Sequence, residues 1–420
     1  MDPRRPRRER PAGPARRRRR PLLPRPGCGM NAGGATRPAP GSGPPEEVLR
    51  ARAYLLRSVE PPNRHLNRLV EEYGPVEAAD RLRHGAVPDE LLRSATARRG
   101  SDHTDADLDT AAAAGARLLV PEDPSWPVWP FAAFAGTRRA DLTPPVALWA
   151  RGPGDAAVLA DRSVTIVGSR AATRYGLHTA ADFAAELGRR GVTVFSGAAF
   201  GIDAAAHRGA LAAGSPTVAV LACGPDRFYP AAHEGLIERI AERGLVLTEY
   251  PPGTVPGRLR FLVRNRLLAA LGAGCLVVEA GARSGSRRTA SDAVALRRPL
   301  MAVPGPVTSG LSVGCHELIR TGDASLVGRP EDVLEVVGRL GVDLAPPPEG
   351  ETRPTDGLAP HALAVHDALP ARAAWPPSRI GEAAGLDADA VRAALTELEE
   401  HGLAEHHQGM WQRPARRGGP

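Results

Sequence analysis

Short segments rich in Gly, Ser and Arg carry the side chains best suited to hold phosphate groups. Such segments occur at residues 168–170, 196–203, 223–229 and 281–289, each directly after an apolar run. A glycine lets a backbone approach a ligand closely, while serine hydroxyls and helix N-terminal N–H groups donate to phosphate oxygens. An arginine can donate two hydrogen bonds to one phosphate. One such loop indicates no more than a tight turn, but four of them predict a phosphate-binding edge.

A further segment, Arg264-Asn265-Arg266, stands at the start of an apolar helical stretch with Phe261 beside it. Two arginines and an asparagine at a helix start suit a clamp on phosphates, and a solvated helix cap is the alternative interpretation.

Two carboxylates are candidate acids. Glu279 ends a predicted strand, and Asp203 lies four residues before His207 on one helical face. They suit acid chemistry in a hydrolase, but Glu279 could instead pair with an Arg of the loops. A helix cap and a surface histidine are the plainer explanation of Asp203 and His207.

The apolar runs before these segments predict the elements that position them. Strands are expected at residues 164–167, 192–195, 217–222, 245–248, 276–279 and 300–303, with helices between them, for example at 177–189, 204–213 and 234–243. This alternation is typical of βαβ units, so the predicted fold is α/β, with an extended Rossmann-like parallel sheet. Ligands bind beyond the carboxyl ends of the strands in such a sheet, which places the loops on one edge.

The rest of the chain divides by composition into flanking parts. We expect a disordered Arg/Pro-rich arm at 1–45, a small helical (SAM-like) domain at 46–95, an extended lead-in packing on the core at 96–161, the core domain at 162–340, a Pro-rich linker at 341–360 and a winged-helix domain at 361–412. The last of these would have helices at 361–369, 378–384 and 388–401 and a hairpin at 403–411. The arm could equally be upstream sequence before a start at Met30.

Positive charge is concentrated in the arm of this 420-residue chain. All 54 basic residues are Arg, and residues 1–26 contain 11 of them against Asp2 and Glu9, a net charge of +9. Since the whole chain carries +7, the residues after 26 carry a net charge of −2. Binding of nucleic acid by the folded part must therefore come from local clusters.

Cysteine usage, hydropathy and motif sequences exclude several classes of protein. Four widely spaced cysteines without a Cys-x-x-Cys motif exclude a disulfide scaffold and a Cys-rich zinc site, and His406 and His407 lack partners at metal-ligand spacing. No apolar run reaches the length of about 18 residues that a membrane span needs, so we expect a cytoplasmic protein. The first loop lacks a Gly-x-Gly-x-x-Gly motif, and a P-loop would need a lysine.

The order and spacing of the motifs resemble the DNA-processing protein A family (DprA, also called Smf). The resemblance is carried by Gly168-Ser169-Arg170, Ser196-Gly197-x-Ala199-x-Gly201-Ile202-Asp203-x-x-Ala206-His207, Arg264-Asn265-Arg266, Glu279-Ala280, Ser284-Gly285-Ser286 and Val303-Pro304-Gly305. It spans residues 162–337, and the helical and winged-helix flanks fit the family less specifically.

This resemblance implies a homodimeric recombination mediator that binds single-stranded DNA, is not an enzyme and needs no cofactor or metal. Such a protein loads the RecA recombinase onto strands covered by single-strand-binding protein, in natural transformation or in general recombination. The residues that would hold the strand by position are Gly168, Ser169, Arg170, Ser196, Gly197, Gly201, Arg264, Asn265, Arg266, Ser284, Gly285 and Thr289. Phe200 stands where many members carry a basic residue, and we expect it to stack on a base.

Two other functions stay open on the residues alone. A Rossmann-like nucleotide or phosphoribosyl hydrolase would use the same loops, with Glu279 or Asp203 as its acid. A transcription regulator would read duplex DNA with the third helix of the winged helix. That helix carries four acidic residues and Arg392 as its only basic one. Because a groove-reading helix meets phosphates, we expect this domain to bind protein, or the core, instead.

Overall fold

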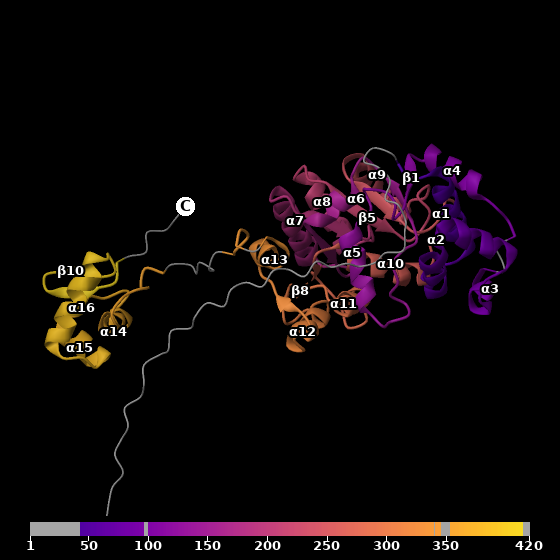
Figure 1. The fold of residues 1–420 in the computed structure, drawn as a ribbon. Helices are drawn as coiled ribbons and strands as arrows, with labels where there is room; N and C mark the ends of the chain where they lie inside the picture. The colour runs from indigo at the N-terminus through magenta and orange to yellow at the C-terminus, as the bar shows by residue number, and fades with distance from the viewer. Residues whose placement is uncertain (1–42, 96–99, 340, 346–352, 415–420) are drawn as a thin grey trace, which may run out of the picture. The chain divides into compact units, whose positions relative to one another are not determined.

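The computed structural model describes residues 43–95, 100–339, 341–345 and 353–414. The chain divides into two compact units, one ending at Gly338 and the other beginning at Arg339 (Figure 1). The predicted arm up to residue 42, and residues 346–352 of the predicted linker, lie outside the described residues.

The first unit is built on one sheet of nine strands in the order β1-β2-β6-β5-β4-β3-β7-β8-β9. The strands are β1 (Ala116–Leu119), β2 (Leu148–Arg151), β3 (Ser163–Val167), β4 (Thr193–Ser196), β5 (Thr217–Leu221), β6 (Leu245–Thr248), β7 (Cys275–Val277), β8 (Leu300–Ala302) and β9 (Ser325–Leu326). Neighbours from β6 to β9 are parallel, whereas β1 and β2, and β2 and β6, are antiparallel. The predicted strands correspond to β3–β8, which confirms the predicted α/β class.

Helices cover both faces of the parallel part of the sheet (Figure 1). One face packs against α7 (Arg174–Arg189), α8 (Ile202–Ala212), α9 (Glu234–Arg243) and α13 (Pro330–Val337), and the other against α10 (Arg258–Leu271), α11 (Ser286–Ala295) and α12 (Val313–Arg320). Every residue of β3–β8 is buried. Strands covered on both faces appear in a sequence as continuous apolar runs, which is why these six were visible there.

The N-terminal helices share a core with the antiparallel edge of the sheet. They are α1 (Glu46–Ser58), α2 (Arg64–His84), α3 (Asp89–Ala95) and α4 (Thr104–Ala113). Asn63 caps α2, because its side chain accepts hydrogen bonds from the amides of His65 and Leu66. Apolar residues of these helices pack with β1 and with the fully buried Trp149 of β2.

The predicted extended lead-in differs from what the structure contains. Besides α4, β1 and β2, it includes α5 (Val128–Ala132), the 3₁₀ helix η1 (Ala133–Gly136) and α6 (Ala156–Asp161). Trp126, Phe131 and Phe134 lie in the same core as α10. β1 and β2 were missed because they lie outside the regular alternation of apolar runs and helical stretches from which the other strands were predicted.

The second unit contains three helices and a hairpin. They are α14 (Pro360–Ala368), α15 (Pro377–Ala384), α16 (Ala388–Glu400), β10 (Glu405–His407) and β11 (Met410–Gln412). Gly385 ends α15 with a φ of 67°, and the Asp387 side chain caps α16. The solvent-exposed side of α16 includes Asp389, Glu399 and Glu400.

Close packing of α7 on α8 depends on Gly209. A Cβ at this position would lie 2.1 Å from the Ala181 carbonyl oxygen of α7. We therefore expect Gly209→Ala to lower the free energy of unfolding by about 1–3 kcal/mol, measured by urea denaturation. Gly235 of α9 is the matched control, since a Cβ there meets nothing within 4 Å. Gly235→Ala should leave stability unchanged or raise it by up to about 1 kcal/mol, and equal effects of the two substitutions would contradict this account.

Candidate functional site

The strand order reverses beside β3, and this creates a place for a ligand. β4, β5 and β6 follow on one side of β3, and β7, β8 and β9 on the other. Loops that leave two such strands diverge and open a crevice at the carboxyl edge. A pocket of about 940 Å³ lies there, here called the strand-end pocket. Its polar and aromatic lining includes Gly168, Ser169, Arg170, Asp203, Tyr229, Arg258, Phe261, Arg264, Asn265, Arg283, Ser284, Gly285, Arg288 and Thr289.

The loop after β3 forms one wall of the pocket and is fixed through its backbone. The Ser169 amide donates to the Glu279 carbonyl at 2.7 Å, and the Ile202 amide donates to the Ser169 carbonyl at 3.2 Å. A Cβ at Gly168 would lie 2.8 Å from the Ile202 Cβ, so only glycine fits. The exposed Arg170 side chain is therefore presented to the pocket by a fixed backbone.

The predicted ligands Ser196 and Gly197 do not line the strand-end pocket. The Ser196 hydroxyl is buried and donates to the Ile166 carbonyl at 2.6 Å. The Gly197 amide donates to the Asp203 carboxylate at 3.1 Å, and its carbonyl accepts from Arg264 at 3.0 Å. Both residues hold the loop after β4 in place, and this segment reaches the pocket through Ala199 of the loop and Asp203 of α8.

Gly201 and Phe200 also lie outside the pocket lining. Gly201 has a φ of 78°, and a Cβ there would lie 2.2 Å from the Ser169 carbonyl oxygen, so it lets the loops after β3 and β4 meet. Phe200 is about half exposed, and its ring makes an edge contact with His233 at 4.6 Å between centroids. The aromatic rings that do line the pocket are Tyr229 and Phe261, with centroids 5.2 Å apart.

Arg264 is a buried cation at the floor of the pocket. It donates to the carbonyls of Gly197 and Val220, at the ends of β4 and β5. Burial lowers the pKa of Arg264 and raises the pKa of Asp203, and the attraction between the two groups opposes both shifts. Asn265 beside it lines the pocket and accepts from Arg264 Nε at 3.3 Å.

His207, expected at the surface, is instead fully buried behind this floor. Its Nδ1 lies 2.8 Å from the Thr217 hydroxyl. Burial lowers the pKa of His207 to about 3, so the imidazole is neutral at pH 7. It acts as a packed polar residue of the core.

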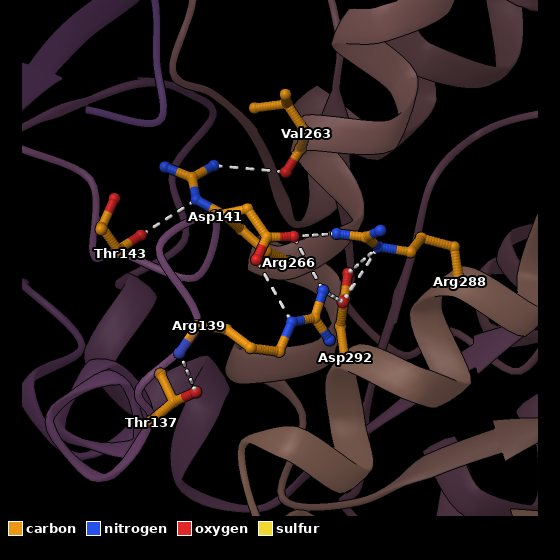
Figure 2. A network of polar contacts seen from close by, with 8 residues as sticks. All are labelled: Thr137, Arg139, Asp141, Thr143, Val263, Arg266, Arg288 and Asp292. Atoms are coloured by element: carbon orange, nitrogen blue, oxygen red, sulfur yellow. Dashed lines mark hydrogen bonds and ion pairs between the residues drawn. The ribbon is translucent and has the colours of Figure 1, made fainter. Parts of the chain in front are cut away.

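Arg266 faces away from the pocket. Its guanidinium donates to the Glu249 carboxylate at 2.8 Å. It also donates to the Thr143 carbonyl at 2.9 Å and to the Val263 carbonyl at 3.3 Å (Figure 2). Arg266 and Glu249 are both buried. The Arg-Asn-Arg motif therefore contributes two residues to the pocket, and its last arginine joins α10 to the end of β6 and to the lead-in.

The loop after β7 and the first turn of α11 form the opposite wall. Ser284, Gly285 and Thr289 line the pocket. The Ser284 and Ser286 hydroxyls are 2.8 Å apart and hydrogen-bonded to each other. This wall also brings Arg283 and Arg288 to the pocket.

The arginines around the pocket differ in how they are neutralised. Arg170, Arg258 and Arg283 are exposed and make no ion pair with any residue of the described ranges. The Arg170 guanidinium lies 5.0 Å from the centroid of the Phe261 ring. Three unneutralised guanidinium groups beside two aromatic rings make a surface suited to several phosphates and to flat apolar groups.

Sequence reasoning missed Arg258 and Tyr229 as pocket residues. Tyr229 belongs to one of the four glycine-rich segments, but no pattern separated it from the residues around it. Arg258 is the first residue of α10, six residues before the recognised Arg264, and only the helix geometry brings both to one opening.

The two candidate acids have internal partners. The Glu279 carboxylate accepts from the Thr173 amide at 2.9 Å and the Thr173 hydroxyl at 2.5 Å, at the start of α7. Glu279 thus fixes a helix N-terminus, as a carboxylate does favourably there. Within the described ranges, His, Cys, Asp and Glu form no group that could hold a metal ion. No helix in those ranges has the length and apolar character to cross a membrane.

An open α/β sheet with a basic pocket at its switch point defines a class of phosphate- or nucleotide-binding proteins. Comparison with known families narrows this class. The family model for DNA recombination-mediator protein A matches residues 117–338. This chain belongs to that family, as its motifs indicated, and is a DNA-processing protein.

Individual relatives agree with this assignment. The chain is 49% identical to a DNA processing protein DprA of Mycobacterium tuberculosis over 372 residues, which is 87% of this chain and 94% of the relative. It is 43% identical to DprA of Streptococcus pneumoniae over 190 residues, 45% of this chain and 66% of the relative. The X-ray structure of the Streptococcus pneumoniae protein aligns with a TM-score of 0.57 at 31% identity, covering 69% of this chain and 98% of the other.

The Arg266–Glu249 pair gives a test of how the site is held. Arg266→Gln leaves the buried Glu249 carboxylate without its counter-charge, so we expect the free energy of unfolding to fall by about 3–5 kcal/mol in urea denaturation. The control is Arg93→Gln, which removes an exposed arginine 3.9 Å from Glu90 and should cost less than about 1 kcal/mol. If Arg266→Gln lowers the free energy of unfolding as little as Arg93→Gln does, the Arg266–Glu249 pair does not hold α10 in place.

Proposed function

We propose that this protein binds single-stranded DNA in the strand-end pocket and acts as a recombination mediator. The observation that carries the proposal is the set of exposed, unneutralised guanidinium groups of Arg170, Arg258 and Arg283 beside the rings of Tyr229 and Phe261. A single strand offers two things that such a surface binds, a row of phosphates and unstacked bases.

The composition of the pocket favours a strand over a duplex or a specific base sequence. Guanidinium groups contact phosphates without regard to sequence, and aromatic rings stack on any base. The residues after 26 carry a net charge of −2, so attraction to DNA must come from this cluster and not from the overall charge of the fold.

We propose further that the bound strand is passed to the RecA recombinase, with single-strand-binding protein as an indirect partner, and that the protein works as a homodimer. Membership of the recombination-mediator family supports this step. The step is measurable as faster RecA assembly on a strand already coated with single-strand-binding protein.

A nucleotide or phosphoribosyl hydrolase is the second candidate, because a buried carboxylate, Asp203, lines the same pocket. The two functions differ in ligand. A hydrolase site is filled by one nucleotide, whereas a strand site needs several phosphates and loses affinity steeply with salt.

Binding of a labelled oligo-dT strand, followed by fluorescence anisotropy at two salt concentrations, tests the proposal. Arg170→Ala should weaken binding at least about tenfold and reduce the slope of log affinity against log salt by about one, because one phosphate contact is lost. Arg239→Ala on α9 is the matched control, since Arg239 is exposed and outside the pocket, and it should change affinity less than about twofold.

Two further arms decide between the alternatives. Mononucleotide added as a competitor should not displace the oligo-dT strand from the wild-type protein. A chain beginning at Met30 should bind the strand almost as tightly as the full chain. Full competition by mononucleotide would favour the hydrolase. Loss of binding only in the chain without the arm would contradict a pocket site.

The second unit should contribute little to strand affinity. Its helix α16 exposes the carboxylates of Asp389, Glu399 and Glu400, which repel a phosphate backbone. A chain ending at Gly338 is therefore expected to bind oligo-dT within about twofold of wild type in the same assay. A tenfold loss would show that the second unit contacts the strand.

A further inference from the structure

One arginine of the strand-end pocket is neutralised, unlike Arg170, Arg258 and Arg283. Arg288 lines the pocket from the first turn of α11, and its guanidinium contacts two carboxylates (Figure 2). One carboxylate belongs to Asp292, one turn later on the same helix, and its Oδ1 lies 3.1 Å from Nε of Arg288. The other belongs to Asp141, which hydrogen-bonds to an outer nitrogen of Arg288.

Arg139 completes a closed ring of charges with these residues. It donates to the Asp141 carboxylate at 2.8 Å and lies 2.9 Å from the Asp292 carboxylate. Two guanidinium groups and two carboxylates leave no net charge. Asp292 is buried beside both arginines, so replacing Asp141 with a neutral residue would leave one positive charge on the ring.

The segment that holds Asp141 also has anchors outside its ion pairs with α11. The Arg139 amide donates to the Thr137 hydroxyl at 3.2 Å, Leu142 is buried in the core, and the Thr143 carbonyl accepts from Arg266. The Asp141 side chain itself is about half exposed. The neighbouring guanidinium groups, Arg139 first, hold the pKa of Asp141 down at about 2, so its carboxylate is charged at pH 7.

A carboxylate against Arg288 occupies a position suited to phosphate. Both anions accept hydrogen bonds from a guanidinium, and a phosphate is also favoured by the N-terminal turn of a helix such as α11. The Ser284 and Ser286 hydroxyls next to this turn are further donors to a phosphate. The pocket therefore holds one arginine whose positive charge is already balanced by one of the protein's own carboxylates.

We propose that Asp141 is a specificity-determining residue, an internal anion that occupies Arg288 and denies it to single phosphates. A ligand must then draw its affinity from Arg170, Arg258 and Arg283 together, which a strand does and a free phosphate or mononucleotide does not. This inference rests on the proposed binding of single-stranded DNA.

Asp141→Asn tests the inference, because asparagine keeps the shape and removes the charge. In the anisotropy assay, the variant should bind oligo-dT about 3–10-fold more tightly, with a salt slope steeper by about one. Inorganic phosphate and dTMP should displace the strand from the variant at concentrations at least about fivefold lower than from wild type. Asp182→Asn, an exposed carboxylate on α7 away from the pocket, is the control for net charge and should change none of these values.

Arg288→Gln separates masking from positioning. Arg288→Gln leaves Arg139 with two carboxylates, a net charge of −1, so strand affinity should fall, but by less than in Arg170→Ala if Asp141 masks Arg288. In the double variant, Arg288→Gln should abolish the gain of Asp141→Asn. Unchanged or weaker strand binding by a folded Asp141→Asn protein overturns the inference. A loss of strand affinity in Arg288→Gln as large as the loss in Arg170→Ala also overturns the inference. This second comparison can be made even if the Asp141→Asn protein does not fold.

The two proposals fail in different ways. Absence of salt-dependent strand binding in wild type overturns the proposed function alone. In that case, direct titration with inorganic phosphate still tests whether Asp141 masks Arg288. Tighter phosphate binding by Asp141→Asn than by wild type supports the masking, and equal binding overturns it.

Discussion

The buried guanidinium groups of α10 are the interaction on which the site depends. Arg264 donates to carbonyls at the ends of β4 and β5, and Arg266 joins Glu249 after β6 to the carbonyl of Thr143 in the lead-in. Desolvating two cations is costly, and the cost is offset only because carbonyls and carboxylates surround them. These two arginines lie in the middle of α10 and not at a helix start as predicted, and from there they fix the relative positions of three strand ends. The wall and the floor of the strand-end pocket follow from that.

Because the chain contains no lysine, one residue type serves every cationic role, and its neighbours decide which. Arg266 pairs with the buried carboxylate of Glu249 and is structural. Arg170 lies near the Phe261 ring, is exposed to solvent and is available to a ligand. Arg288 lies between these cases, since its partners are one buried and one half-exposed carboxylate. The planar guanidinium group can fill each of these three roles because its five N–H donors can be shared among several acceptors.

The sequence predicted the parallel sheet well because strands covered on both faces are marked by continuous apolar runs. It placed the loops after β3 and β7 at the pocket for the same reason. It did not separate Arg264 and Arg266 into a floor residue and a structural residue, since the partner of Arg266 is Glu249, on another strand end. Nor could it show that Ser196 and Gly197 shape their loop from inside, because the partners Ile166 and Arg264 are distant in the sequence. The strands β1 and β2 were missed because they lie on the antiparallel edge, outside the alternation of apolar runs and helices that marks βαβ units.

The antiparallel edge of the sheet cannot be completed until a strand made late in synthesis is available. β1 and β2 pair with each other, and the other edge of β2 pairs with β6, which leaves the ribosome roughly 90 residues after β2. Until then, β2 presents unpaired N–H and C=O groups on that side. A nascent chain of this kind exposes a strand edge that can pair with another chain, so the N-terminal half depends on later sequence to become protected from aggregation.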